Sequence, residues 1–262
     1  MRLDVYLTVN GHAASRTQAQ ELIGGGYVTV NGKILRKASA PIDEACPPDI
    51  LVTGRPHPYV GRGGLKLEGA LAEFSIDVSG AVCADIGAST GGFTDCLLRH
   101  GAARVFAVDS GSDQLAQVLR EDSRVVNIEH FNARNLTPET LGCLCDVAVA
   151  DLSFISQTYV LRNIGAILKP GGIYIGLIKP QFECGPAALD RRGIVKSAAD
   201  HAAAIRRVRD AAGEACLDMH RIAVSPIQGG DGNREFLCLC IKTEIAANGS
   251  IPDTEISKLV KT

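Results

Sequence analysis

Apolar and polar residues follow two different periods along this chain, and these periods predict its elements. Between residues 61 and 242, short runs rich in Val, Ile and Ala recur, and segments with apolar residues at helical spacing separate them. The expected strands cover residues 81–85, 104–109, 125–129, 145–151, 173–179, 220–224 and 235–242. The expected helices cover residues 65–74, 93–99, 114–120, 157–167 and 198–216.

This alternation predicts an α/β fold. Strands that are apolar along nearly their whole length and alternate with helices are typical of a doubly wound, mostly parallel sheet. We therefore expect a Rossmann-like sheet of seven strands. The stretch "SPIQGGDGN" before the last strand fits a hairpin better than a crossover, so we expect that strand to be antiparallel.

The first 45 residues predict a separate, small α+β domain. A short helix is closed by Gly11, Ser15 caps "RTQAQELIGGG", and Asn31-Gly32 joins two short strands. Residues 46–61 contain four prolines and are expected to form a stiff linker, although a strand at 50–52 could belong to the first domain. We expect residues 62–244 to form the second domain and 245–262 a peripheral tail.

Composition excludes several classes of protein. The 262 residues are 46% hydrophobic and 21% charged, as in a globular protein, and no apolar run is long enough to span a bilayer. The N-terminus has no signal-peptide pattern. The nine cysteines are an odd number without a Cys-x-x-Cys pair, so reduced thiols, a cytoplasmic location and no metal are expected rather than disulfides or zinc.

The charge is unevenly distributed. The whole chain has a net charge of −2, but its first forty residues carry five Lys or Arg against two Asp or Glu. A basic head on a mildly acidic body favours a polyanionic partner, whereas an ordinary solvated surface is the alternative.

The stretch "VCADIGASTGGFTDCLLRHG", residues 82–101, contains the most informative turn. Glycines between a strand and a helix place backbone N–H groups at the ligand-binding edge of the sheet. Asp85 is expected to point an anion into the pocket, which suits a cationic ligand, and Asp109 ends the next strand where such folds hold ribose hydroxyls. A nucleoside with a cationic arm is S-adenosylmethionine; a simple tight turn is the alternative.

Four charged residues suggest a catalytic group. Asp151 and Lys179 end two apolar strands, Lys66 lies on the first helix of the second domain, and Glu235 opens the last strand. Each has an ordinary structural explanation by itself, as a cap or a solvated charge. Together, two lysines and two carboxylates fit the methylation of a sugar hydroxyl, which must be oriented and deprotonated.

These motifs resemble known families. Residues 62–242, with "RGGLKLEGAL", "DIGASTGGFTDCLL", "VADLSFIS", "KPQFE" and "GNREFL", resemble the RrmJ/FtsJ-like ribose 2′-O-methyltransferases. Their Lys-Asp-Lys-Glu tetrad falls on Lys66, Asp151, Lys179 and Glu235. Residues 2–40 resemble the alpha-L RNA-binding fold of a ribosomal protein. The two in this order are similar to the TlyA family, known both as haemolysins and as rRNA 2′-O-cytidine methyltransferases.

The resemblance implies transfer of a methyl group from S-adenosylmethionine to cytidine in small- or large-subunit rRNA. It places Asp109 at the ribose and Asn132 near the adenine. The cofactor turn would comprise Asp85, Gly87, Ser89, Gly91, Gly92 and Phe93. RNA, in free rRNA or ribosomal subunits, would be bound by Arg2, Arg16, Lys33, Arg36, Lys37, Arg62, Arg191, Arg192 and Lys196.

Two alternatives come from other classes of protein. One is a haemolysin-like, membrane-active protein, for which the sequence offers no spanning segment and no long cationic amphipathic helix. The other is an RNA-binding module with a vestigial cofactor pocket, which the complete tetrad and glycine turn disfavour.

Overall fold

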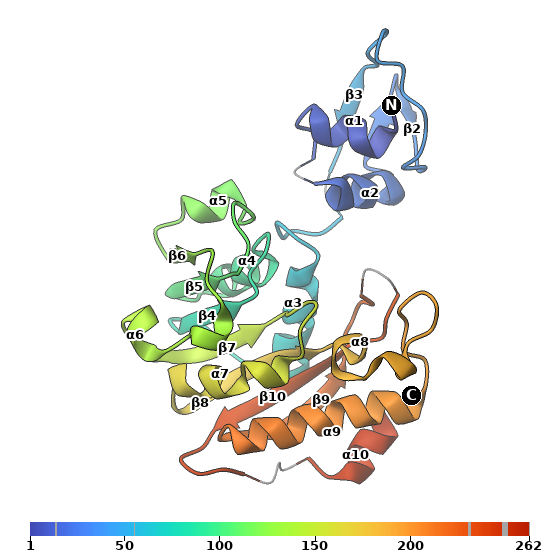
Figure 1. Ribbon diagram of the computed structural model, residues 1–262. Helices are drawn as coiled ribbons and strands as arrows, with labels where there is room; N and C mark the ends of the chain where they lie inside the picture. Colours follow the sequence, from blue (N-terminus) through green and yellow to red (C-terminus); the bar gives the residue numbers. More distant parts are fainter. Residues whose placement is uncertain (14, 55, 230–231, 248–250, 262) are drawn as a thin grey trace. The chain divides into compact units, whose positions relative to one another are not determined.

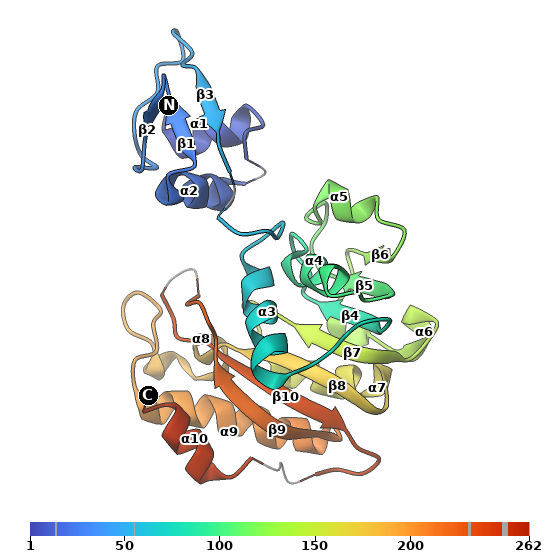
Figure 2. The ribbon, with the colours of Figure 1, turned by 180° about the vertical axis from the view of Figure 1, so that it is seen from behind.

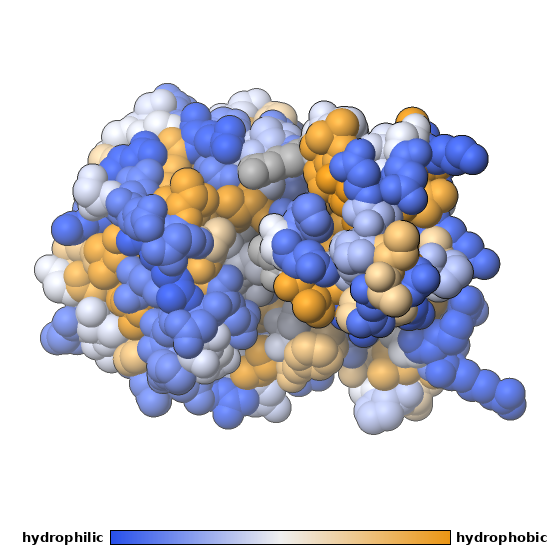
Figure 3. All heavy atoms as spheres, turned by 90° about the horizontal axis from the view of Figure 1, so that it is seen from above, coloured by the Kyte–Doolittle hydropathy of each residue, from blue (hydrophilic) through white to orange (hydrophobic). Residues whose placement is uncertain are grey.

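A computed structural model describes residues 1–13, 15–54, 56–229, 232–247 and 251–261. The chain divides into two compact units, Met1–Pro58 and Tyr59–Thr262, each with its own hydrophobic core (Figure 1). Among the described residues, no helix is both long and apolar enough to cross a membrane. Figure 3 shows hydrophobic residues scattered among hydrophilic ones on one face of the molecule.

The first unit packs two helices on a small antiparallel sheet. Its sheet has the order β2-β1-β3, and Ser15 accepts a hydrogen bond from the backbone N–H of Gln18 at the start of α2. Asn31 and Gly32 both have positive φ, as a tight two-residue hairpin requires. The elements are α1 (Leu3–Val9), α2 (Arg16–Gly25), β1 (Val28–Val30), β2 (Lys33–Ile34) and β3 (Ile50–Val52).

The expected linker at 46–61 is wrong in its extent, whereas the alternative of a strand at 50–52 in the first domain is confirmed. Strand β3 lies inside it and pairs with β1, Val28 opposite Val52 and Val30 opposite Ile50, so the first unit extends to Pro58. The prolines flank this strand and leave its N–H groups free to pair. Tyr59 is buried in the core of the second unit, and so the two units divide between residues 58 and 59.

The second unit contains the predicted seven-stranded sheet. Its order is β6-β5-β4-β7-β8-β10-β9, and β10 alone runs antiparallel to its neighbours, as the sequence predicts. The strand order reverses direction between β4 and β7. The strands are β4 (Val82–Ile86), β5 (Arg104–Val108), β6 (Val125–Ile128), β7 (Cys145–Ala150), β8 (Leu168–Ile178), β9 (Leu217–Val224) and β10 (Phe236–Lys242).

Helices cover both faces of this sheet (Figures 1 and 2). On one face pack α3 (Gly63–Phe74), α4 (Gly92–Arg99) and α5 (Gln117–Arg120). On the other pack α6 (Pro138–Leu141), α7 (Leu161–Ile167), α9 (Ala198–Glu214) and α10 (Asp253–Leu259), while short α8 (Pro180–Glu183) follows β8. The predicted helix at 157–167 begins as a separate 3₁₀ turn, Gln157–Tyr159.

The tail is not peripheral, contrary to the expectation for residues 245–262. Ile251, Ile256 and Val260 are buried in the same core cluster as Ile205 and Val208 of α9. A few apolar residues, correctly spaced on one face of a helix, are enough to dock it, although the segment as a whole is polar.

All nine cysteines are free thiols, as expected. Cys238 and Cys240 share one buried face of β10, in agreement with their spacing. Cys143 and Cys145 have the same spacing but do not share a strand face, because β7 begins only at Cys145 and Cys143 is exposed.

Candidate active site

The carboxyl ends of four neighbouring parallel strands carry the charged residues that the sequence singles out. Asp109 follows β5, Gly87 follows β4, Asp151 follows β7 and Lys179 follows β8. Because β4 and β7 are adjacent where the strand order reverses, these groups meet at the position where doubly wound sheets bind ligands.

The four predicted catalytic side chains form one connected group. Lys66 Nζ lies 2.6 Å from Glu235 Oε2 and 4.0 Å from Asp151 Oδ2. Lys179 Nζ lies 2.7 Å from Asp151 Oδ1 and donates a hydrogen bond to Ser153 Oγ at 2.8 Å. Asp151 therefore stands between the two ammonium groups, and the arrangement alternates in sign.

Burial separates the roles of these residues. Lys66, Lys179 and Glu235 are each less than 10% exposed, so two positive charges are held in a largely dry environment by two negative ones. A buried charge that loses its partner costs several kcal/mol of stability, on the order of 3–5 kcal/mol. Each member of the group therefore holds its neighbour in place. Of these four residues, Asp151 and Lys179 line a cavity at this edge of the sheet, whereas Lys66 and Glu235 do not line it.

Two adjoining cavities open at this edge of the sheet. The larger has a volume of about 400 Å³ and the smaller about 210 Å³, and both are lined by Gly87, Ser89, Asp151 and Ser153. Asp109 and Asn132 line the larger cavity, and Gly92 and Phe93 line the smaller. Further residues of the larger cavity are Val108, Ser110, Gln114, Phe131, Ala133, Leu152, Phe154, Ile155 and Val160.

Asp85 does not point into the cavity, contrary to the sequence-based expectation. Its side chain lies on the same face of β4 as Cys83, toward α4, and Thr94 Oγ1 donates a 2.7 Å hydrogen bond to Asp85 Oδ2. The other carboxyl oxygen has no hydrogen-bond partner among the described residues. Burial, with a smaller effect from Asp151, raises the pKa of Asp85 to about 7.

Gly91 is also outside both cavities. It has a φ of +94°, and a Cβ there would lie 2.3 Å from Leu119 and 2.8 Å from Leu115. The residue is therefore glycine because it caps α4 in a left-handed conformation beneath α5. Its role is to shape the turn that carries the cavity wall.

Gly92 allows two helices to begin side by side. A Cβ at Gly92 would lie 2.9 Å from the backbone nitrogen of Gly64 and 3.0 Å from the carbonyl oxygen of Gly61. The glycine turn and the "GRGG" segment before α3 are therefore complementary surfaces. This contact places α3, and with it Lys66, against the cavity.

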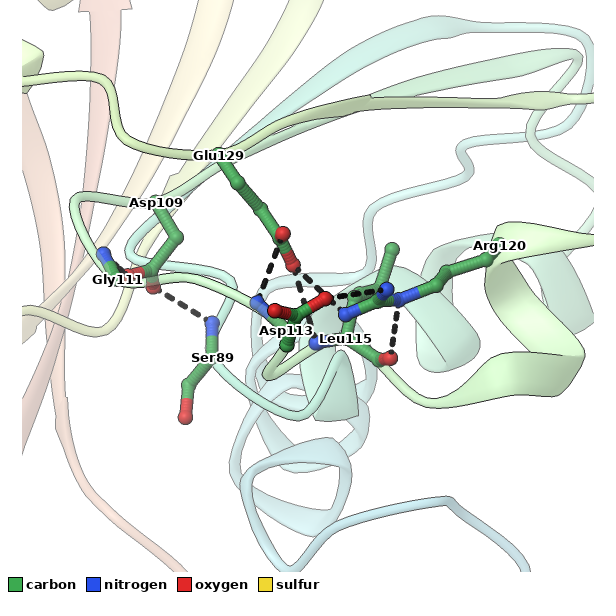
Figure 4. Close-up of polar contacts among 7 residues, drawn as sticks. All are labelled: Ser89, Asp109, Gly111, Asp113, Leu115, Arg120 and Glu129. Carbon is green, nitrogen blue, oxygen red and sulfur yellow. Dashed lines mark hydrogen bonds and ion pairs between the residues drawn. The ribbon is translucent and has the colours of Figure 1, made fainter.

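Asp109 joins the glycine turn to the loop after β5 (Figure 4). Its Oδ2 accepts a hydrogen bond from the backbone N–H of Ser89 at 2.8 Å, and its Oδ1 accepts one from Gly111 at 2.7 Å. Ser89 itself has a φ of +48°. Asn132 also lines the larger cavity, and its Oδ1 accepts a hydrogen bond from the backbone N–H of Arg134 at 3.0 Å.

An ionic cluster fixes the loop that borders this cavity. Glu129 accepts a hydrogen bond from the backbone N–H of Asp113 at 2.9 Å, and Arg120 pairs with Glu129 at 3.2 Å and Asp113 at 3.1 Å (Figure 4). Hydrogen bonding to that backbone N–H lowers the pKa of Glu129. The loop therefore presents Ser110 and Gln114 to the cavity from a fixed backbone.

Sequence reasoning missed several residues of the site. Phe154 has a positive φ of 63° and is 91% exposed, and the centroid of its ring lies 5.4 Å from that of Phe182 in a tilted arrangement. Lys179 Nζ lies 5.9 Å from the centroid of that second ring. Ser153, the partner of Lys179, and Thr94, the partner of Asp85, are among the other omissions. Their sequence neighbours give no indication of them, because each acts through a partner that is distant along the chain.

The predicted RNA-binding residues lie on both units. In the first unit, Arg2 and Arg16 pair with buried Asp4 at 2.9 and 3.3 Å, and Arg36 donates to the carbonyl oxygen of Gly24. Lys33 and Lys37 are exposed. In the second unit, Arg62 donates to the carbonyl oxygen of Gln228, Lys196 pairs with Asp190, and the neighbouring Arg191 and Arg192 are exposed.

No metal site is evident in the part of the chain that is described. There, no three His, Cys, Asp or Glu side chains are grouped so that they could hold a metal ion. The charged group described above is instead internally paired.

The switch-point cavity and the seven-stranded sheet with one antiparallel strand define a Rossmann-like methyltransferase fold. Residues 59–241 match the model of the FtsJ-like methyltransferases, and residues 1–45 match that of the S4 domain. The chain belongs to the FtsJ-like methyltransferase family and carries an N-terminal S4 domain.

Curated relatives cover nearly the whole chain. It is 43% identical to the 16S/23S rRNA (cytidine-2′-O)-methyltransferase TlyA of Mycobacterium tuberculosis, over 94% of this chain and 91% of that protein. It is 41% identical to YqxC of Bacillus subtilis, a candidate rRNA methyltransferase, over 99% of this chain and 92% of the relative. A solved structure of a candidate hemolysin from Streptococcus thermophilus superposes with a TM-score of 0.80 at 38% identity, covering 100% and 94% of the chains.

Proposed function

We propose that this protein transfers the methyl group of S-adenosylmethionine to the ribose 2′-OH of cytidine in rRNA. The observation that carries this proposal is the connected group of Lys66, Asp151, Lys179 and Glu235, of which Asp151 and Lys179 line the smaller cavity. The names of the relatives supply the substrate class, rRNA cytidine. The proposed location of this activity is the cytoplasm.

The cavity fits the cofactor. A volume of about 400 Å³ lies within the range of small-molecule sites. Gly87 lines both cavities, and a Cβ there would lie 3.1 Å from Leu152 and 3.2 Å from the carbonyl oxygen of Asp151, so glycine avoids a crowded contact with the end of β7. Asp109 would hold the ribose, and Asn132 with Phe131 would surround the adenine. The bound cofactor supplies an electrophilic methyl group on a sulfonium.

The residues of the chain act on the ribose hydroxyl. Lys179, held by Asp151 and Ser153, would orient the 2′-oxygen and stabilise the negative charge that develops on it, while the hydroxyl proton passes to solvent water and the methyl group bonds to that oxygen. Lys66 and Glu235 hold Asp151 from behind. An ammonium paired at 2.7 Å with a carboxylate suits orientation and charge stabilisation better than proton abstraction.

Substitution of Lys179 tests the mechanism. Lys179→Ala is expected to lower kcat for rRNA methylation by about 10²–10⁴-fold, while the Kd for S-adenosylmethionine changes little. The matched control is Lys169→Ala, at the start of β8 and far along the strand from the site. The assay measures incorporation of labelled methyl groups into ribosomal subunits. A fully active Lys179→Ala variant would remove this lysine from the mechanism.

Mapping of 2′-O-methyl groups tests the substrate. rRNA from cells with and without the gene should differ at one or more cytidines. If no position differs and the purified protein methylates neither subunit, the proposed function is wrong. Calorimetry with S-adenosylmethionine, with and without RNA, separates this case from a vestigial pocket.

The hemolysin description of a similar structure favours one second candidate, a membrane-active protein. Purified protein would then release dye from liposomes without other factors. Release that is equal in the wild type and in Lys179→Ala would support membrane activity separate from this site.

A further inference from the structure

A tight turn between α8 and α9 presents two consecutive arginines. Leu189 and Val195 form an antiparallel bridge at its base. Within it, Gly193 donates a backbone hydrogen bond to the carbonyl oxygen of Asp190 at 2.9 Å, and Asp190 donates one to that of Ile194 at 3.0 Å. Gly193 has a φ of +75°, which glycine adopts without strain. Residues 189–196 are called the arginine turn below.

Asp190 locks the arginine turn from inside. Its Oδ1 accepts hydrogen bonds from the backbone N–H groups of Arg192 at 2.8 Å and Ile194 at 3.0 Å, and its Oδ2 pairs with Lys196 at 2.8 Å. The hydrogen bond from Lys196, supported by those backbone groups, lowers the pKa of Asp190 to about 2. The backbone donors of the turn are therefore satisfied internally at neutral pH.

Two buried side chains fix the base of the arginine turn. The backbone N–H of Val195 donates to Asn233 Oδ1 at 3.0 Å, and its carbonyl oxygen lies 3.0 Å from His201 Nε2. Asn233 Nδ2 also donates to the carbonyl oxygen of Gly193 at 3.1 Å. Val195 and Asn233 are almost fully buried. This is more support than a solvated surface loop requires.

Asn233 connects the arginine turn to the active site. It lies two residues before Glu235, which holds Lys66 at 2.6 Å. In Figures 1 and 2, the loop before α9 and the segment before β10 lie beside each other. The turn and the catalytic group therefore share one support.

The tip of the arginine turn is available to a ligand. Arg191 and Arg192 are exposed, and neither side chain has a hydrogen-bond or ion-pair partner among the residues described. Guanidinium groups match the geometry of phosphate oxygens, and a fixed backbone lowers the ordering cost of binding.

We propose that the arginine turn is a preorganised phosphate-binding element that holds the RNA backbone beside Glu235, and that Asn233 is its positioning residue. This inference rests on the proposed function, because its occupant is the RNA strand that is methylated. Contacts to phosphates fix the register of that strand rather than read its sequence.

The first test removes the two charges. Arg191→Gln/Arg192→Gln is expected to raise the Kd for rRNA about 10-fold and to reduce the slope of log Kd against log salt by about 1.4 to 2, while the Kd for S-adenosylmethionine stays unchanged. Arg104→Gln/Lys169→Gln is the matched control, since it removes the same charge at the amino ends of β5 and β8. A double variant that binds rRNA like this control would overturn the proposal.

The second test keeps both charges and releases the anchor. Asn233→Ala is expected to raise the KM for rRNA three- to tenfold, with the salt dependence of the wild type. If Asn233→Ala lowers kcat and leaves the KM for rRNA unchanged, Asn233 positions Glu235 rather than the arginine turn, and the proposed role of Asn233 is wrong.

RNA binding in the first test is measured without cofactor, so that test is independent of methyl transfer. If the wild type methylates rRNA but the double variant matches its control, only the arginine turn is wrong. If the wild type methylates no rRNA, the proposed function fails, and the binding data still decide this inference.

Discussion

Asp85 is the residue whose environment differs most from the sequence-based expectation. The alternation of β4 turns its side chain toward α4, where Thr94 is its hydrogen-bond donor. A carboxyl group in this position is stabilised in its neutral form, since burial raises its pKa to about 7. Its ionisation therefore opposes folding.

Asp85→Asn is expected to change the pH dependence of stability. The pKa of Asp85 is higher in the folded than in the unfolded chain, so the wild type loses stability as the pH rises from about 4 to 7, and Asn does not. The free energy of unfolding of the variant relative to the wild type should increase by up to about 4 kcal/mol between pH 4 and pH 8. Urea unfolding at pH 4.5, 6 and 8 measures this. If the free energy of unfolding of the two proteins changes equally with pH, this prediction is wrong.

The charged group of the site could be predicted at the residue scale because charges are rare at the ends of apolar strands. Asp151 and Lys179 stand out for this reason. Which side chain faces the cavity could not be predicted, because that depends on the pleat and on distant partners. Ser153, Thr94 and Phe154 were missed for the same reason.

The elements were easier to predict than their packing. The seven strands of the second unit follow from apolar runs, and the hairpin at Asn31-Gly32 follows from turn chemistry. The pairing of β3 with β1 and the docking of α10 depend on contacts between residues far apart in sequence. Local sequence therefore misassigned the second segment as a peripheral tail, and it offered the strand at 50–52 only as an alternative within a linker.

Gly92 sets the distance between the starts of α3 and α4. Gly92→Ala is expected to lower the free energy of unfolding by about 1–3 kcal/mol, because its Cβ would meet the backbone of Gly61 and Gly64. Displacement of α3 would also move Lys66, so kcat should fall. Gly185→Ala is the control, since no atom lies within 4 Å of its Cβ position and its φ is not positive. Equal stability of the two variants in urea would show that the helices adjust freely.

The docking of α10 can be measured through Ile256, which is fully buried. Ile256→Ala is expected to cost about 2–5 kcal/mol of stability. Lys258→Ala, on the exposed face of the same helix, should change it by less than about 0.5 kcal/mol. Thermal unfolding followed by circular dichroism compares them. Similar melting temperatures for both variants would restore the peripheral assignment of this segment.

At the scale of the whole molecule, each unit contributes a different part of the proposed activity. The cavities and the charged group lie entirely within Tyr59–Thr262, and the S4 domain lies within Met1–Pro58. Each unit has its own core, so separation is a practical experiment. The chain that joins them makes RNA capture by one unit an intramolecular step for the other.

Removal of residues 1–58 is therefore expected to separate cofactor binding from RNA recognition. The remaining unit should bind S-adenosylmethionine with an unchanged Kd, whereas kcat/KM for rRNA should fall by about 10²-fold or more, because effective concentration is lost. The salt dependence of RNA binding should also weaken as the phosphate contacts of the S4 domain disappear. Addition of the separate S4 domain should not restore the rate at micromolar concentration. A truncated protein that methylates ribosomal subunits at the full rate would show that the second unit alone recognises its substrate.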